Sequence, residues 1–320
     1  MPYRKKIILL LSVSVFLAVV YILSLVFDPA RANVRNEQFT WLPAGLRDEA
    51  DRIEIFRGGE KIELVLKNGD WYVLSEQLEI PARQGRIDDL FRLLSTRGAF
   101  PQRGNTGASH AELGLDGSVR LVIRGGAGLP LLELFVGTED PSGKSVFLRK
   151  SGESQFRSGD RLISTYINGE KNSWLNLKLF DEISVAYVQR VLVYYSGFYG
   201  IGEEVSPAPY KDYTICRSGE NWEIDSILDK DRTENWIRAV LEATADDILP
   251  SPVAEISGMP PAIALIRAEL GDGGALELQV YEPMEDGKAF AIVKGKPFVY
   301  VLSQWTAVRI LRDSGFFESR

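Results

Sequence analysis

The feature that most constrains the fold is an internal repeat covering most of the chain after the first fifty residues. A helix-type stripe of apolar residues, spaced i, i+3, i+4 and i+7, occurs twice without a gap. Each stripe follows a turn signal and a tryptophan, Asn68-Gly69-Asp70-Trp71 first and Ser218-Gly219-Glu220-Asn221-Trp222 second. The shared order predicts a tandem duplication. The stripes are Ile87, Leu90, Phe91 and Leu94, then Ile237, Val240, Leu241 and Thr244.

Strand and helix signals alternate in the same sequence in both copies. Alternating apolar residues or short β-rich runs predict the strands, and the longer stripes predict the helices. In the first copy the strands are 52–55, 61–67, 71–74, 119–124, 131–136, 145–149 and a short one around Phe156, with helices at 82–99 and 160–167. In the second copy the strands are 190–193, 213–217, 222–224, 262–270, 276–281, 289–293 and 298–302, with helices at 232–245 and 303–311.

This pattern predicts an α+β fold. Hairpins alternate with isolated helices and do not form βαβ crossovers, so each copy should be a twisted, mostly antiparallel sheet with its helices packed on one face. We expect the first copy at residues 51–180, the second at 181–320, and a linker at 28–50.

The N-terminal segment resembles a transmembrane anchor. Arg4, Lys5 and Lys6 precede an uncharged apolar run from Ile7 to Phe27, close to the roughly 20 residues that a helix needs to cross a bilayer. Cations before such a run remain in the cytoplasm. We therefore expect residues 1–6 inside, 7–27 in the membrane and the remainder outside, in the periplasm of an inner-membrane protein. A cleaved signal peptide is an alternative, since Ala30-Arg31-Ala32 offers a cleavage motif; a buried soluble helix is another.

Charge and cysteine content narrow the classes of partner. The formal net charge is −7, and the exported part is more acidic still because three cations stay inside. This balance disfavours nucleic acid and wide contact with anionic lipid. The single cysteine, Cys216, excludes an internal disulfide and lies in a strand-like segment, where we expect it to be buried.

Gly137 to Ser145 superficially resembles a phosphate-binding loop. It has one residue too many for G-x4-G-K-[ST], and it joins two expected strands, whereas such a loop leads into a helix. We interpret it as a hairpin turn and expect no bound nucleotide.

No arrangement of residues predicts catalysis or a cofactor. His110 is the only histidine, too few for the usual zinc ligand sets. The acidic pairs Asp88-Asp89, Asp181-Glu182 and Asp246-Asp247 are adjacent in sequence, so their side chains diverge and fit solvated faces better than a glycosidase pair. We predict no catalytic, metal or cofactor site. Carboxylates that folding brings together would support an envelope hydrolase, which remains an alternative.

One aromatic stretch is the candidate interaction patch. Tyr194, Tyr195, Phe198 and Tyr199 lie in a segment broken by glycines. Alternate rings would enter the core, and the others would form an exposed aromatic surface of the kind that binds partners.

The chain resembles a bacterial family known as domain of unknown function 4340. The matching residues are the basic N-terminus with its apolar run, Gly69-Asp70-Trp71-Tyr72, Glu112 to Asp116, Phe135-Val136-Gly137 and the Ser142-Gly143-Lys144 turn. The family's usual proline is missing after Leu115-Asp116, although Pro260-Pro261 is similar to it in the second copy. The resemblance covers about residues 40–180 well and the second copy loosely.

The resemblance implies an anchored envelope protein. Members of the family are often encoded beside gliding-type ABC transporter components, which suggests a transporter permease or auxiliary subunit as partner. We therefore expect a non-catalytic accessory or scaffold subunit of such a complex. The alternative is an extracytoplasmic domain that binds a glycan, lipid or peptide.

Overall fold

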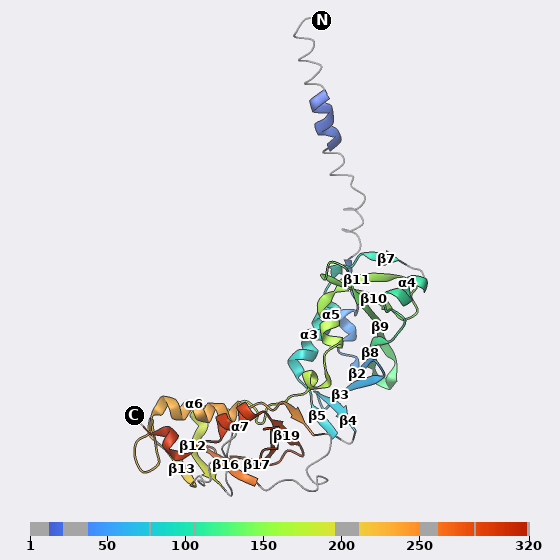
Figure 1. Ribbon diagram of the computed structural model, residues 1–320. Coiled ribbons are helices and arrows are strands. Elements are labelled where there is room, and N and C mark those ends of the chain that lie inside the picture. The colour runs from blue at the N-terminus through green and yellow to red at the C-terminus, as the bar shows by residue number, and fades with distance from the viewer. Residues whose placement is uncertain are drawn as a thin grey trace, which may run out of the picture. The chain divides into compact units, whose positions relative to one another are not determined.

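The computed structural model describes most of the chain as α+β, with mostly antiparallel strands in two large sheets and few helices (Figure 1). The chain divides into two compact units. The first comprises Met1–Trp71 and Arg83–Glu170, and the second Tyr72–Ala82 and Lys171–Arg320. The sequence predicted the boundary between the copies after residue 180, ten residues later than the observed one after Glu170, and it placed Tyr72–Ala82 in the first copy. The described residues are 13–21, 38–76, 78–104, 107–195, 211–249, 262–284 and 286–318.

The first large sheet has the strand order β5-β4-β3-β2-β8-β9-β10-β11-β7. Asn68 and Gly69 separate β3 from β4 with φ angles of 54° and 92°, as a two-residue turn of type I′ requires. The strands are β2 (Ala50–Arg57), β3 (Glu60–Lys67), β4 (Asp70–Ser75), β5 (Leu78–Pro81), β7 (Gln102–Gly104), β8 (Val119–Gly125), β9 (Pro130–Glu139), β10 (Ser145–Lys150) and β11 (Phe156–Asp160).

The second large sheet has the order β14-β13-β12-β16-β17-β18-β19-β15. Its strands are β12 (Val188–Tyr194), β13 (Tyr213–Ser218), β14 (Asn221–Glu223), β15 (Asp247–Ile248), β16 (Ala262–Leu270), β17 (Ala275–Tyr281), β18 (Ala289–Val293) and β19 (Val299–Leu302).

The helices α3 to α7 and several short elements complete the two units. Asp160, Asp229 and Ser303 each cap a helix by accepting a hydrogen bond from a backbone N–H in its first turn. The helices are α3 (Gln84–Ser95), α4 (Gly107–Glu112), α5 (Arg161–Ile167), α6 (Lys230–Leu241) and α7 (Gln304–Ile310). The 3-10 turns are η1 (Ala44–Leu46), η2 (Gly126–Gly128), η3 (Lys171–Trp174), η4 (Val185–Tyr187) and η6 (Ser314–Phe317), and β1 (Gln38–Phe39) pairs with β6 (Gly98–Ala99).

The two sheets have the same topology. The run β4-β3-β2-β8-β9-β10-β11-β7 corresponds strand for strand to β14-β13-β12-β16-β17-β18-β19-β15. Helix α3 occupies the place of α6, and α5 the place of α7, and within each unit these two helices contact each other.

Each unit has its own core between the helices and one side of the strands. In the second unit the Trp236 Nε1 on α6 donates to the carbonyl oxygen of Ile310 on α7 at 3.0 Å, which joins the two helices inside that core. The first core includes Ile53, Ile55, Leu121, Ile123, Leu134, Ile87, Leu90, Phe91 and Leu94. The second includes Val191, Val193, Ile266, Leu278, Val280, Trp236, Ile237, Val240 and Leu241.

Both long helices end earlier than the sequence predicted. Helix α3 stops at Ser95 because Thr96 has an extended backbone, and Gly98–Ala99 pairs with β1. Helix α6 stops at Leu241, so Thr244 does not belong to its stripe; it forms a β-bridge with Lys178. In both places a short β pairing competes with continued helix. The predicted stripe is correct for the seven other residues, all of which are buried.

The N-terminal segment is described only in part. Residues 13–21 are helical and exposed, and among the described residues no helix is both long and apolar enough to cross a membrane. The expected linker 28–50 is partly folded into the first unit. Trp41 and Leu42 are buried and donate backbone hydrogen bonds to Leu94 at the end of α3. Residues 28–37 lie outside the described residues.

Candidate functional site

One side of the first sheet carries a connected set of charged and aromatic side chains, here called the charged face. Successive side chains of a strand point to opposite sides, so Glu54 and Phe56 lie opposite the buried Ile53 and Ile55. The strand register shows which residues of the neighbouring strands point to this same side of the sheet. The charged face consists of Arg52, Glu54 and Phe56 on β2, Lys61 and Glu63 on β3, Arg120, Val122 and Arg124 on β8, Glu133 and Phe135 on β9, and Arg149 on β10.

Glu54 is at the centre of this face and is only 5% exposed. One of its carboxylate oxygens is 2.6 Å from Lys61 Nζ, and the other is 2.8 Å from Arg124 Nε. Burial alone would raise the pKa of Glu54, but the hydrogen bonds and positive charges of Lys61 and Arg124 outweigh it, so the pKa lies below its usual value. Glu54 is therefore ionised at neutral pH.

The other two carboxylates of the charged face are also paired. Glu63 contacts Lys61 at 2.8 Å and Arg52 at 3.0 Å, and Glu133 contacts Arg120 at 3.2 Å. Burial lowers the pKa of Lys61, yet its two carboxylate partners raise it above the usual value. Lys61 therefore joins two strands as a permanent cation, and the network holds its side chains in defined positions.

Two aromatic rings alternate with the cations. The Phe56 ring lies between Lys61 Nζ at 5.7 Å and the Arg120 guanidinium at 4.1 Å from its centroid. The Arg149 guanidinium is 4.3 Å from the Phe135 centroid and donates to two backbone carbonyls. Such cation–π contacts are worth about 0.5–1 kcal/mol at exposed sites, and they hold the cations against the sheet.

The charge of this face is opposite to that of the whole protein. It carries five cations and three carboxylates, whereas the chain has a formal net charge of −7. Arginine and aromatic residues are the types that are enriched in protein interfaces. The arrangement is therefore suited to binding an acidic protein surface.

The corresponding side of the second sheet carries a single line of ion pairs. Glu269 contacts Arg190 at 3.4 Å and Arg267 at 3.5 Å, and Glu277 contacts Arg267 at 3.3 Å and Lys294 at 2.8 Å. This line crosses from β12 to the end of β18. It includes no carboxylate as buried as Glu54, because Glu277, its least exposed carboxylate, remains 16% exposed.

Cys216 lies on the same side of the second sheet. It is directly opposite Arg190 in the register and is half-buried. The expectation that Cys216 is buried in the core was wrong, because strand alternation places Ile215 in the core in its stead.

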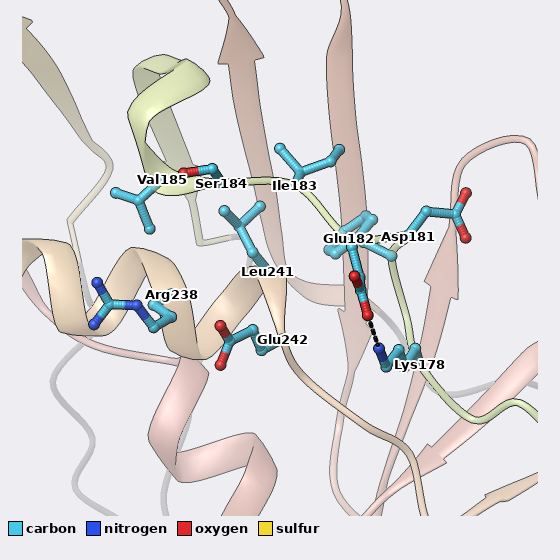
Figure 2. Close-up of a pocket in the computed structure, with 10 residues that line it drawn as sticks. Lys178, Asp181, Glu182, Ile183, Ser184, Val185, Arg238, Leu241 and Glu242 are labelled. Atoms are coloured by element: carbon cyan, nitrogen blue, oxygen red, sulfur yellow. Dashed lines mark hydrogen bonds and ion pairs between the residues drawn. The ribbon is translucent and has the colours of Figure 1, made fainter. Parts of the chain in front are cut away.

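A groove of about 630 Å³ in the second unit lies between residues 178–185 and the C-terminal half of α6 (Figure 2). Its apolar floor comes from Phe180, Val185 and Leu241, which are buried. On one side of the rim Lys178 pairs with Glu182 at 2.9 Å, and this hydrogen bond lowers the pKa of Glu182. An apolar floor with a charged rim can hold a small amphipathic ligand. The opposite rim carries Arg238 and Glu242.

The predicted aromatic patch is described only in part. Tyr194 is 43% exposed on β12. Tyr195 is half-buried, and its hydroxyl donates to the carbonyl oxygen of Arg312, as does that of Tyr213. Phe198 and Tyr199 lie outside the described residues. The role of this stretch as an interaction patch stays a prediction.

The segment that resembles a phosphate-binding loop is a hairpin turn. Gly137 to Ser145 forms the end of β9, a turn and the start of β10, so the predicted hairpin is confirmed. Within the turn, Asp140 accepts hydrogen bonds from Ser142 and Lys144.

His110 on α4 contacts the carbonyl oxygen of Ser154 at 2.9 Å. Among the described residues, no three His, Cys, Asp or Glu side chains are grouped as metal ligands would be.

Both members of each acidic pair lie in the same place in the fold. On α3, Asp88 pairs with Arg47 and Asp89 pairs with Arg92. Asp181 and Glu182 both line the groove of the second unit, and Asp246 directly precedes Asp247 in β15.

Sequence reasoning missed the charged face, although a signal for it was present. In 52–56 and 120–124 the residues that alternate with the apolar core positions are mostly charged. Such alternation predicts a solvated face, but which strands lie side by side decides which charges meet.

Comparison with known proteins yielded no match: no family model, curated protein or solved structure matches the chain.

Proposed function

We propose that this chain is a membrane-anchored envelope protein whose charged face binds an acidic protein partner. In this proposal residues 7–27 are the anchor, and the chain is an accessory or scaffold subunit of an ABC-transporter-like complex of the gliding type. The resemblance to domain of unknown function 4340 and the N-terminal sequence support the anchor and the class of complex. The charged face is the observation that carries the binding role.

The matching strand orders support an origin by tandem duplication. Independent folds would have no reason to share eight strand positions, both helix positions and a tryptophan in the equivalent strands β4 and β14. In a duplicated protein one copy can specialise while the other keeps the scaffold. We infer that the first copy carries the specialised face, because its network has a buried carboxylate and two aromatic rings.

The arrangement of the charged face favours binding. Its cations are held by ion pairs and by aromatic rings, so little side-chain entropy remains to be lost when a partner binds. An opposing acidic surface would contact the guanidinium groups of Arg120 and Arg149, which adjoin Phe56 and Phe135. Electrostatic attraction of this kind mainly raises the association rate and selects the partner.

Site-specific crosslinking in cells tests this proposal. A photoreactive amino acid in place of Phe135 in the full-length protein should capture a membrane-complex subunit, identified by mass spectrometry after detergent purification. The same amino acid in place of Lys144, in the exposed β9–β10 turn, is the matched control and should capture little. Adding Arg120→Glu and Arg149→Glu should remove the Phe135 crosslink. Equal capture from both positions, or capture that survives charge reversal, contradicts the charged face as the interface.

A second candidate function is small-ligand binding in the groove of the second unit. Its volume and apolar floor favour this reading over a flat protein contact. A screen of glycans, lipids and peptides should find a ligand whose affinity falls at least tenfold with Leu241→Asn in a variant that still folds. Unchanged affinity in that variant excludes the groove. The aromatic stretch is tested separately by Tyr195→Ala with Phe198→Ala.

A further inference from the structure

A second basic region lies at the β7–β10–β11 end of the first unit (Figure 1). Outside the charged face, the segments 97–104 and 150–158 contain four cations and one carboxylate, Glu153. This composition contrasts with the acidic balance of the chain as a whole. The two segments come together because β11 pairs with both β7 and β10.

Phe39 is the centre of this region. Its ring lies between Lys150 Nζ, at 4.8 Å from the centroid, and the Arg157 guanidinium, at 4.6 Å. The Phe100 ring is 6.4 Å away, edge to face. Arg97 precedes Gly98, which pairs with Phe39 between β6 and β1. We call Phe39, Arg97, Phe100, Lys150 and Arg157 the basic–aromatic patch; Arg103 adjoins it and donates to Ser158 Oγ on β11 at 2.8 Å.

Three cations of this region are outside the ion pairs of the described residues. Arg97 and Arg103 are exposed, and across the described residues no carboxylate forms an ion pair with Arg97, Arg103 or Lys150. Burial lowers the pKa of Lys150, Glu153 partly opposes this, and the charge of Arg157 lowers it further. A nearby anion would therefore stabilise the charged form of Lys150.

The patch is also close in sequence to the proposed anchor. Only residues 28–37 separate the end of the apolar run at Phe27 from β1 at Gln38. From Phe27 to Phe39 the chain advances twelve residues, which reach about 42 Å when fully extended. In a protein anchored at Phe27, this length sets the greatest distance between Phe39 and the outer end of the anchor.

We propose that the basic–aromatic patch contacts the anionic phospholipid head groups of the membrane that holds the anchor. Arginine and lysine side chains would bind lipid phosphates, and the half-buried rings of Phe39 and Phe100 would face the interfacial region. This contact would orient the first unit on the membrane. The inference rests on the proposed membrane anchor and adds a lipid class and a site to it.

Hydrogen exchange of the full-length protein in lipid nanodiscs tests the inference. One set of discs contains phosphatidylcholine alone, and in the other a third of the lipid is phosphatidylglycerol. We expect amide exchange in peptides covering 97–104 and 150–157 to slow about fivefold in the anionic discs. Arg97→Glu with Arg103→Glu should abolish this difference. The matched control, Arg83→Glu with Lys144→Glu, changes two other exposed cations of the chain and should keep it.

The outcomes separate this inference from the proposed function. Insertion into discs without any effect of lipid charge overturns the lipid contact and leaves the anchor intact. Protection that appears only in native membranes, and not in anionic discs, also overturns it and indicates a protein partner. Failure of the chain to insert into either disc contradicts the anchor itself. Equal melting temperatures of the two charge-reversal variants show that any loss of protection is not due to unfolding.

Discussion

The buried sides of the two sheets resemble each other more closely than their solvated sides do. Both cores pack a long helix of the same length against equivalent strands, with four or more apolar side chains of that helix buried. On the solvated side, the first sheet has a branched network around Glu54, and the second has a line of partly exposed pairs. The topology therefore restricts the core, while the solvated sides are free to diverge in chemistry.

The largest expected effect tests the similarity of the cores. Trp71 on β4 and Trp222 on β14 occupy equivalent positions and are 9% and 0% exposed. Replacing either by alanine should cost about 3–5 kcal/mol of stability, since each leaves a large cavity. Urea unfolding of the full-length protein in detergent measures both. A loss below about 1 kcal/mol for only one of them would show that the two cores are not equivalent.

The next effect separates the two solvated sides. Glu54→Ala should destabilise the protein by about 2 kcal/mol, because Lys61 and Arg124 lose a buried partner. Glu269→Ala should cost at most about 1 kcal/mol, since its pairs are exposed to solvent. Equal losses in urea unfolding would contradict the distinction between a buried centre and an exposed line of pairs.

The pH dependence sharpens the role of Glu54. Because its pKa in the folded state is lowered from 4.5, the folded state favours ionised Glu54. Its contribution is present above pH 4.5 and is lost as the pH falls through the lowered pKa. The difference in unfolding free energy between the wild type and Glu54→Gln should therefore shrink as the pH falls below 4.5. Val122→Ala on the same face removes no titratable group and should give a difference that does not follow this titration.

The smallest effect concerns the aromatic rings. Phe56→Leu keeps an apolar side chain but removes the ring between Lys61 and Arg120, so it should cost about 0.5–1 kcal/mol. Leu192→Val on β12 is the control. It changes an apolar residue opposite Arg267 without removing a ring, so it should leave the contribution of Arg267 to stability unchanged. A double-mutant cycle of Phe56→Leu with Arg120→Ala measures the coupling. A coupling energy of zero would show that the contact between Arg120 and the Phe56 ring does not stabilise the protein.

The sequence by itself determined the α+β class, nearly all of the longer strands and helices, and the order in which they repeat. Period-2 and period-3.6 patterns depend only on which side of an element is buried, so Ile53 and Ile55 in a strand and Ile87 and Leu90 in a helix were correctly predicted as core. The short strands β7 and β15 were missed, and the helix ends at Ser95 and Leu241 were misplaced, because pairing with distant segments decides them. Strand β5 was also missed, although it pairs with the neighbouring β4.

Only the tertiary structure decided which charges meet. Glu54 and Arg124 are 70 positions apart, and Phe39 reaches Lys150 and Arg157 only through the folding of the first unit. The net charge of −7 is a sum over the whole chain and does not report where charges gather. It therefore gave no sign of the charged face or of the basic–aromatic patch. The physical reason is that core burial is a local pattern along the chain, whereas electrostatic interaction depends on separation in space, which strand order and register create.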